Sequence, residues 1–181
     1  MYLLVRTEKV DGMKFPITNY RNEPENPVAF IGYRFVFKRV IDLDDIEENV
    51  DASEEVVCDF LIEKEQLCCE YHGVSIGRNS VFDRVKEEYE CDDEKYNTEE
   101  GTEIDVKNFE GALLRSITVN NLVVVTNDYQ RKQWRLFEMK FVDGRTLPIW
   151  IFNDHNGMYD HYYIGSVFAR ESGFAIVKGD I

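Results

Sequence analysis

Two of the chain's three histidines lie within IFNDHNGMYDHYY (151–163), together with two aspartates and an Asn-Gly pair. Closely spaced imidazoles and carboxylates are the groups that ligate zinc and that act as general acids and bases in hydrolases. Asn-Gly, however, is also the pair that a two-residue hairpin turn prefers, because both central residues adopt positive φ. The stretch therefore supports either a metal or catalytic site or a structural turn, and we favour the turn.

The turn interpretation separates the two histidines. If Asn156-Gly157 closes a tight turn, Phe152 pairs with His161, and His155 projects from the opposite face of the hairpin. A single zinc ion would need both imidazole nitrogens about 2.0–2.1 Å away, which this arrangement forbids. A turn with an odd number of residues would reverse the faces. We expect His161 to be a hydrogen-bonded, partly buried residue of an aromatic sheet.

A second polar stretch, CCEYH (68–72), holds two adjacent cysteines and the third histidine. Adjacent cysteines do not match the Cys-x-x-Cys spacing of zinc sites and redox motifs. On a strand Cys68, Glu70 and His72 share one face, but Cys68 and His72 lie roughly 13 Å apart at about 3.3 Å per residue. We favour buried structural cysteines over a metal site, a reactive thiol or a vicinal disulfide.

Catalytic motifs are absent from the sequence: it has no Gly-x-Ser-x-Gly, Walker loop, Gly-x-Gly-x-x-Gly or His-Glu-x-x-His. The chain is therefore expected to act without an enzymatic reaction and without a cofactor. A metal-dependent hydrolase using His72, His155 or His161 is the weakest alternative, and no metal ligand is assigned.

The charge is concentrated in the middle of the chain. Residues 42–110 carry 24 acidic and 6 basic side chains, a net charge of −18, whereas the whole chain carries −14. This distribution gives no basic footprint for nucleic acid. A concentrated negative field attracts a basic partner and speeds its encounter, although excess surface carboxylates often serve solubility alone.

The strands and helices expected from the sequence indicate an α+β fold, mostly an antiparallel sheet with one or two short helices. We expect a single domain over residues 1–181 with an acidic subregion at 42–110. Strands are expected at 1–7, at 28–41, on both sides of residues 63–65, and through most of 112–163. Helical spacing predicts one short helix near 80–90, and the composition of 91–105 indicates a loop or disorder.

The clearest hairpin joins WRLFEMKFV to RTLPIWIF through Asp143-Gly144. A two-residue turn pairs Phe137 with Trp150, which predicts one aromatic face that Tyr159, His161 and Tyr163 extend. A small-molecule or nucleotide-binding module that sequesters a signalling ligand is the first alternative function. Its predicted ligand-binding residues are Arg131, Arg135, Trp150, Tyr159 and Tyr162.

The sequence also indicates a compartment. It has no signal peptide and no apolar run of the roughly 20 residues that span a bilayer. Four cysteines without a secretion signal indicate reduced thiols, so a cytoplasmic protein without membrane contact is expected.

Two motifs, KEQLCCE (64–70) and HNGMY (155–159), resemble those of a family of small phage and prophage proteins of unknown function. That family carries His-Glu-Gln-Asp-Cys-Cys-Glu in one strand and Ser-Asn-Gly-Tyr-Tyr near its C-terminus. The chain departs from it at four positions, where Lys64, Leu67, His155 and Met158 replace the family's His, Asp, Ser and first Tyr. The resemblance covers roughly residues 60–76 and 118–165, and it implies a phage or mobile-element origin but no activity.

Small acidic proteins of phage origin often bind a host enzyme that handles nucleic acid. We therefore predict an anti-CRISPR or anti-restriction inhibitor whose carboxylates mimic nucleic-acid phosphates in the basic groove of a host nuclease, in the host cytoplasm. The predicted partner-binding residues are Asp42, Asp44, Asp45, Glu47, Glu48, Glu87, Glu88, Asp92, Asp93 and Glu94.

Overall fold

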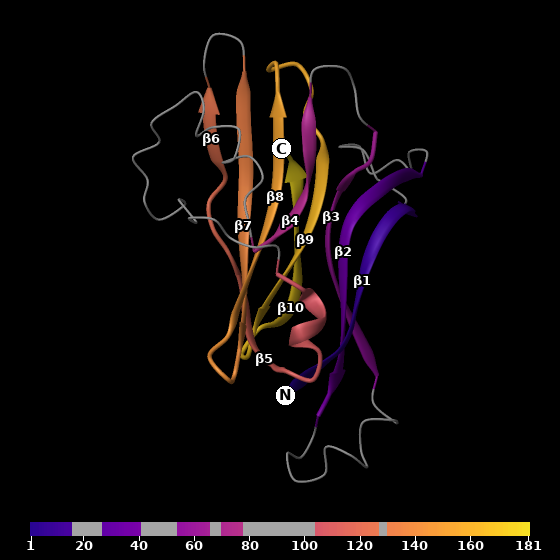
Figure 1. Ribbon diagram of the computed structural model, residues 1–181, viewed down its shortest axis with the longest axis vertical. Coiled ribbons are helices and arrows are strands. Elements are labelled where there is room, and N and C mark those ends of the chain that lie inside the picture. Colours follow the sequence, from indigo (N-terminus) through magenta and orange to yellow (C-terminus); the bar gives the residue numbers. More distant parts are fainter. Residues whose placement is uncertain (16–26, 41–53, 66–69, 78–103, 127–129) are drawn as a thin grey trace.

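The computed structural model describes residues 1–15, 27–40, 54–65, 70–77, 104–126 and 130–181, which form ten strands and one 3₁₀ helix (Figure 1). The strands are β1 (Tyr2–Phe15), β2 (Val28–Arg39), β3 (Glu55–Glu63), β4 (Tyr71–Ile76), β5 (Leu113–Val119), β6 (Val123–Thr126), β7 (Arg131–Phe141), β8 (Thr146–His155), β9 (Tyr162–Ala169) and β10 (Gly173–Asp180). The 3₁₀ helix η1 covers Val106–Phe109.

The predicted α+β class is wrong for the described residues, of which 72% lie in strands and none in a helix of seven residues or more. The physical reason is the apolar pattern: long runs rich in β-branched and aromatic residues, such as that of β2, bury one face of a pleated strand. The predicted helix at 80–90 lies outside the described residues. No helix in the described part of the chain is long and apolar enough to cross a membrane.

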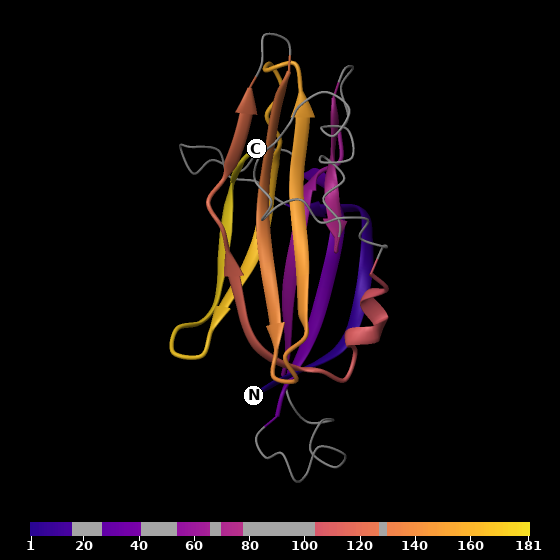
Figure 2. The same cartoon turned by 60° about the vertical axis from the view of Figure 1, so that its left-hand side comes forward.

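The strands form one antiparallel sheet in the order β10-β9-β3-β2-β1-β5-β7-β8-β4, with β6 paired to β7. A further contact between β5 and β9, at Ile117 and Phe168, closes β9-β3-β2-β1-β5 into a ring. The strands follow the long axis of the molecule in two views (Figures 1 and 2). The closed part encloses the main core, whose fully buried rings include Phe35, Phe60 and Phe137.

The hairpin of β7 and β8 exists, but its predicted register is wrong by one residue. Phe137 pairs with Ile149 rather than with Trp150. The loop has three residues because Phe141 N donates to the carbonyl of Arg145 at 2.9 Å, while Gly144 adopts a φ of 90°. A type I turn followed by a left-handed glycine is the usual three-residue hairpin loop. The odd loop length reverses which side chains share a face.

The reversed register separates the aromatic residues into two clusters. Phe137 and Ile149 lie in the main core, whereas Trp134, Leu136, Trp150 and Phe152 form a second cluster on the other face of β7 and β8. The predicted single face of Phe137 and Trp150 is therefore absent.

The predicted second hairpin at Asn156-Gly157 is a turn without a strand pair. Gly157 has a φ of 89°, which agrees with a turn. Among the described strands, however, β8 pairs with β4 and β7, and β9 pairs with β3, β5 and β10. Phe152 and His161 are not partners, so His155 and His161 do not lie on opposite faces of one hairpin.

Gly165 in β9 lies directly against the ring of Phe137 from β7, and its substitution tests how tightly the core is packed. A Cβ atom built there would lie 2.2 Å from Phe137 Cζ. We predict that Gly165→Ala lowers the free energy of unfolding by about 1–3 kcal/mol, because core overpacking strains rotamers and backbone. Urea denaturation measures the change. Gly179→Ala is the matched control, since its Cβ would meet nothing closer than 3.6 Å; an equal loss in both variants would contradict the packing described.

Candidate metal centre

Four titratable side chains meet where β3 ends and where β4 and β9 begin. Glu63 is the last residue of β3, Glu70 directly precedes β4, His72 is the second residue of β4, and His161 directly precedes β9. The side chains of Glu70, His72 and His161 are 0%, 2% and 5% exposed, and that of Glu63 is 22% exposed. Charged groups are almost never buried this far unless they are paired.

His161 links the two carboxylates. Its Nε2 lies 2.9 Å from Glu70 Oε2, and its Nδ1 lies 3.7 Å from Glu63 Oε2. Glu63 also accepts a hydrogen bond from the backbone N–H of Tyr162 at 3.1 Å. Burial alone lowers the pKa of His161, but the hydrogen bonds and charges of Glu63 and Glu70 outweigh burial and raise it above its usual value. The raised pKa favours the imidazolium form of His161, whose Nε2–H donates to Glu70 and whose Nδ1–H faces Glu63.

His72 is neutral, and its tautomer follows from its hydrogen bond. Its Nε2 lies 2.8 Å from the carbonyl oxygen of Glu63, and a carbonyl only accepts, so Nε2–H donates. Burial, reinforced by the charge of His161, lowers the pKa of His72. The proton of the neutral ring therefore sits on Nε2, and Nδ1 carries a lone pair.

The lone pair of His72 Nδ1 is buried without a hydrogen-bond partner among the described residues. It lies 3.7 Å from Glu70 Oε1, which is itself an acceptor when ionised. The imidazole of His72 stacks on that of His161, with ring centroids 4.0 Å apart and planes 22° from parallel. His72 Nδ1 and Glu70 Oε1, two atoms that can each donate an electron pair, thus lie 3.7 Å apart in a desolvated space, an arrangement that a cation beside both would stabilise.

One ligand atom from each of Glu70, His72 and His161 lies within 4.8 Å of the other two. Ligand atoms about 2.0–2.1 Å from a tetrahedral zinc ion lie roughly 3.4 Å apart, so any pair near the 4.8 Å limit must approach by more than about 1 Å on binding. The two imidazoles, now 22° from parallel, must also tilt so that both ring planes meet at the ion. Two imidazoles and a carboxylate suit zinc and other divalent transition metals. Glu63 and the carbonyl of Glu63 occupy the positions of outer partners that orient metal-bound histidines.

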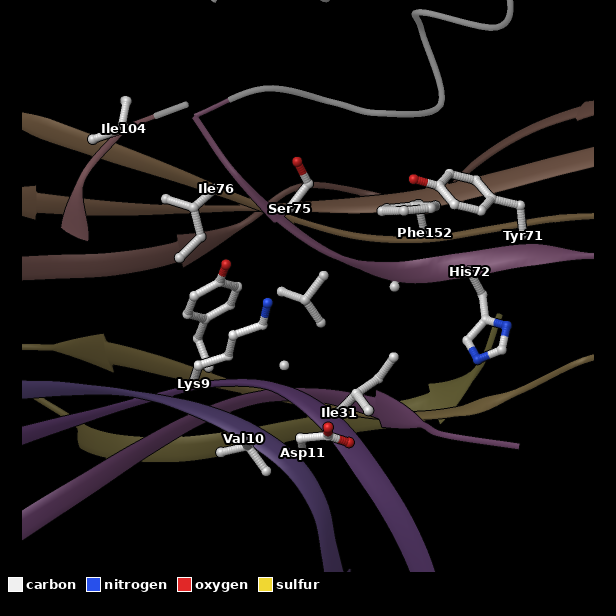
Figure 3. A pocket seen from close by; sticks show the side chains of 14 residues that line it. Lys9, Val10, Asp11, Ile31, Tyr71, His72, Ser75, Ile76, Ile104 and Phe152 are labelled. Atoms are coloured by element: carbon white, nitrogen blue, oxygen red, sulfur yellow. The ribbon is translucent and has the colours of Figure 1, made fainter. Parts of the chain in front are cut away.

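A cavity of about 540 Å³ lies beside His72, between β4 and the pair β1–β2. Figure 3 shows the imidazole of His72 pointing from β4 toward β1 and β2 at one end of this cavity, with Lys9 near the other. Tyr71 leaves the opposite face of β4 and packs on Phe152, with ring centroids 5.3 Å apart. The pleat of β4 therefore aims His72 inward.

His155 belongs to a separate hydrogen-bond group. Its Nδ1 accepts from the backbone N–H groups of Gly157 at 3.1 Å and Tyr159 at 3.3 Å, and its Nε2 lies 3.0 Å from the Gln133 amide. Burial lowers its pKa, which Asp160 only partly opposes. His155 is thus the buried acceptor that holds the 156–159 turn, and His161 makes its hydrogen bond to Glu70 instead.

The structure does not bring the five predicted ligand-binding residues together. Arg135 lies over the ring of Tyr163, whereas Trp150 pairs with Leu136 and so projects from the other face of the hairpin. Tyr162 packs against Phe30 in a third apolar cluster. Arg131 pairs with His155 at the far end of β7, and Tyr159 lies in the turn after β8.

The predicted partner-binding carboxylates, Asp42, Asp44, Asp45, Glu47, Glu48, Glu87, Glu88, Asp92, Asp93 and Glu94, lie outside the described residues, as do Cys68 and Cys69. The structure confirms that Glu70 and His72 lie on the same side of the chain, since both contact the same buried cluster. No sequence pattern distinguishes Glu63 from its neighbours, because carboxylates are frequent throughout residues 42–110.

No family model, curated protein or solved structure matches the chain.

In protein freed of metal by a chelator, the pKa values of the three histidines should be shifted in different directions. Relative to the ordinary value of about 6.5, we predict a higher midpoint for His161 and lower midpoints for His72 and His155. NMR of the imidazole carbon-bound protons measures all three. Glu63→Gln should lower the His161 midpoint and leave the midpoints of His72 and His155 below the ordinary value.

These pKa shifts determine how the stability of the fold depends on pH. The raised pKa of His161 stabilises the fold fully below pH 6.5, and this contribution disappears as the pH rises through the folded-state pKa. The lowered values of His72 and His155 act oppositely, so their contribution disappears as the pH falls below about 6.5. A His161 midpoint at or below 6.5 would contradict the stabilisation of its imidazolium form by Glu63 and Glu70.

Proposed function

We propose that the chain is a metal-binding protein whose Glu70, His72 and His161 hold one divalent transition-metal ion of the zinc type. The observation that supports this most directly is the buried lone pair of His72 Nδ1, which no described residue satisfies. Buried polar atoms in folded proteins nearly always have a partner. A cation is a partner that His72 Nδ1 and Glu70 can accept together.

The hydrogen bonds around the site support the same ligand set. The Nε2–H of His72 donates to a backbone carbonyl, as the second nitrogen of a metal-bound histidine commonly does. Glu63 faces Nδ1 of His161 and leaves Nε2 directed at Glu70. A metal ion would replace the proton now held between His161 and Glu70, so binding releases a proton.

A metal at this position would act mainly by holding two distant segments together. Glu70 and His72 open β4, which lies at one end of the strand order, whereas His161 leads into β9 near the other end. The three ligand side chains are 5% exposed or less, so the ion would be largely shielded from solvent. A tetrahedral ion would need a fourth ligand beyond these three. Binding to the folded state alone raises its stability by mass action.

Zinc titration of chelator-treated protein tests the ligand set. We predict one bound Zn²⁺ per chain by calorimetry, with a rise in melting temperature on binding. Glu70→Gln and His161→Gln should each lower the affinity at least tenfold, because each removes a ligand atom.

His155→Asn is the matched control, since it changes a buried histidine outside the cluster and keeps an acceptor near the Nδ1 position. It should bind Zn²⁺ like the unchanged chain. Equal losses in all three variants, or no stoichiometric zinc binding by the folded protein, would overturn the metal proposal. Circular dichroism establishes that each variant is folded.

A second proposal rests on the net charge of −18 over residues 42–110. We propose that this acidic segment binds a basic host protein, such as a nuclease of a CRISPR or restriction system, in the cytoplasm of a phage host. The support is the confinement of the charge and the resemblance of KEQLCCE and HNGMY to a phage family. The metal site would then stabilise the sheet that carries the segment.

Charge reversal tests this second function. Replacing Asp42, Asp44, Asp45, Glu47 and Glu48 by Lys should abolish binding to the basic target, because like charges then face each other. Binding of the unchanged chain should weaken steeply as salt rises, as phosphate mimicry requires. Affinity pull-down from host lysate, followed by inhibition assays at two salt concentrations, gives the measurement. Inhibition that survives the charge reversal would contradict the proposal.

A further inference from the structure

A pocket of about 630 Å³ lies at the end of the sheet where the chain begins. The N-terminus, the β7–β8 turn and the β9–β10 turn gather at this end (Figures 1 and 2). Its wall includes Tyr2, Arg39, Leu114 and Phe168, and the volume falls within the roughly 300–1,000 Å³ of small-molecule sites. The pocket is separate from the metal centre, with which it shares no residue.

Three arginines, Arg39, Arg115 and Arg170, line this pocket, and no carboxylate does so among the described residues. Elsewhere in the structure arginines are paired with acids: Arg34 binds Asp59 at 2.7 Å, and Arg145 binds Asp143 at 2.7 Å. The three pocket arginines form no ion pair within the described part of this strongly acidic chain. Their convergence gives a local positive field at one end of the sheet.

The backbone beside the pocket is shaped by a β-bulge. The register of β5 against β7 shifts between Leu114 and Ser116, so Arg115 is the extra residue. Bulges redirect a side chain and are frequent next to binding sites. Tyr2 pairs with Arg39 on one side and with Leu114 on the other, which places a ring between two of the arginine-bearing strands.

The pocket also has an aromatic wall. The ring of Tyr2 packs edge-on against Phe168, with centroids 5.3 Å apart, and against Phe174 at 4.8 Å. Tyr2 is partly exposed, so part of its ring is accessible from the pocket. A ligand that combines anionic groups with a flat apolar part would contact both the guanidinium groups and this ring.

We propose that this pocket binds a small organic phosphate of the nucleotide type, with its phosphates on Arg39, Arg115 and Arg170 and its ring system against Tyr2. Guanidinium groups bind phosphate through paired N–H donors, which makes arginine the preferred residue for such anions. The finite pocket volume favours a small molecule over a nucleic-acid strand. The proposal is independent of the metal centre, since neither site supplies a residue to the other.

Calorimetry with ADP, inorganic pyrophosphate and adenosine tests the proposal on the full chain. ADP should bind most tightly, pyrophosphate more weakly, and adenosine least, because the phosphates supply the charge and the base supplies the ring contact. Arg115→Gln and Arg170→Gln should each lower the ADP affinity at least about tenfold, the effect expected for losing a charge-assisted hydrogen bond.

Arg131→Gln is the matched control, because Arg131 lies at the opposite end of β7 from this pocket. It should bind ADP like the unchanged chain. Absence of ADP binding at millimolar concentration, or equal loss in all three arginine variants, would overturn the proposal. Equal affinity for ADP and pyrophosphate would overturn the role of Tyr2 as the ring platform, which Tyr2→Leu tests separately.

Discussion

The burial of Glu70 beside two stacked imidazoles is the constraint on which the rest of the structure depends. Removing a charge from water costs several kcal/mol, and the imidazole of His161, 2.9 Å away, offsets part of that cost for Glu70. His72 Nδ1 is left without a hydrogen-bond partner among the described residues. A buried lone pair beside a carboxylate is the chemical condition for holding a cation.

The sheet topology creates this condition from segments that are distant in sequence. Glu63 closes β3, Glu70 and His72 open β4, and His161 follows the turn after β8. β4 reaches the cluster through its pairing with β8, whereas β9 reaches it through its pairing with β3. The turn at residues 156–159 therefore connects His155, at the end of β8, to His161, just before β9, without pairing the two residues across one hairpin. The same topology leaves three arginines together at the other end of the sheet.

Short sequence patterns correctly predicted the features that depend on neighbouring residues alone. The alternating run at 28–41 forms β2, and period two correctly placed Glu70 and His72 on one side. The β7–β8 hairpin was predicted in the correct place but in the wrong register, because Gly144 terminates a three-residue loop that Asp-Gly alone does not distinguish from a two-residue one. The contact of His161 with Glu70 spans 91 residues and depends on strand pairings that no local pattern encodes. The α+β prediction is wrong for the described residues because 72% of them lie in strands, and the helix expected at 80–90 lies outside those residues.

X-ray absorption spectroscopy at the zinc edge, on the protein loaded with one equivalent of Zn²⁺, tests the metal centre most directly, because it identifies the ligand atoms themselves. The account predicts a first shell of imidazole nitrogen and carboxylate oxygen at about 2.0–2.2 Å, with the outer-shell scattering of two imidazole rings, and loss of one ring in His161→Gln. A first shell of sulfur at about 2.3 Å, or a spectrum unchanged in His161→Gln, would contradict it.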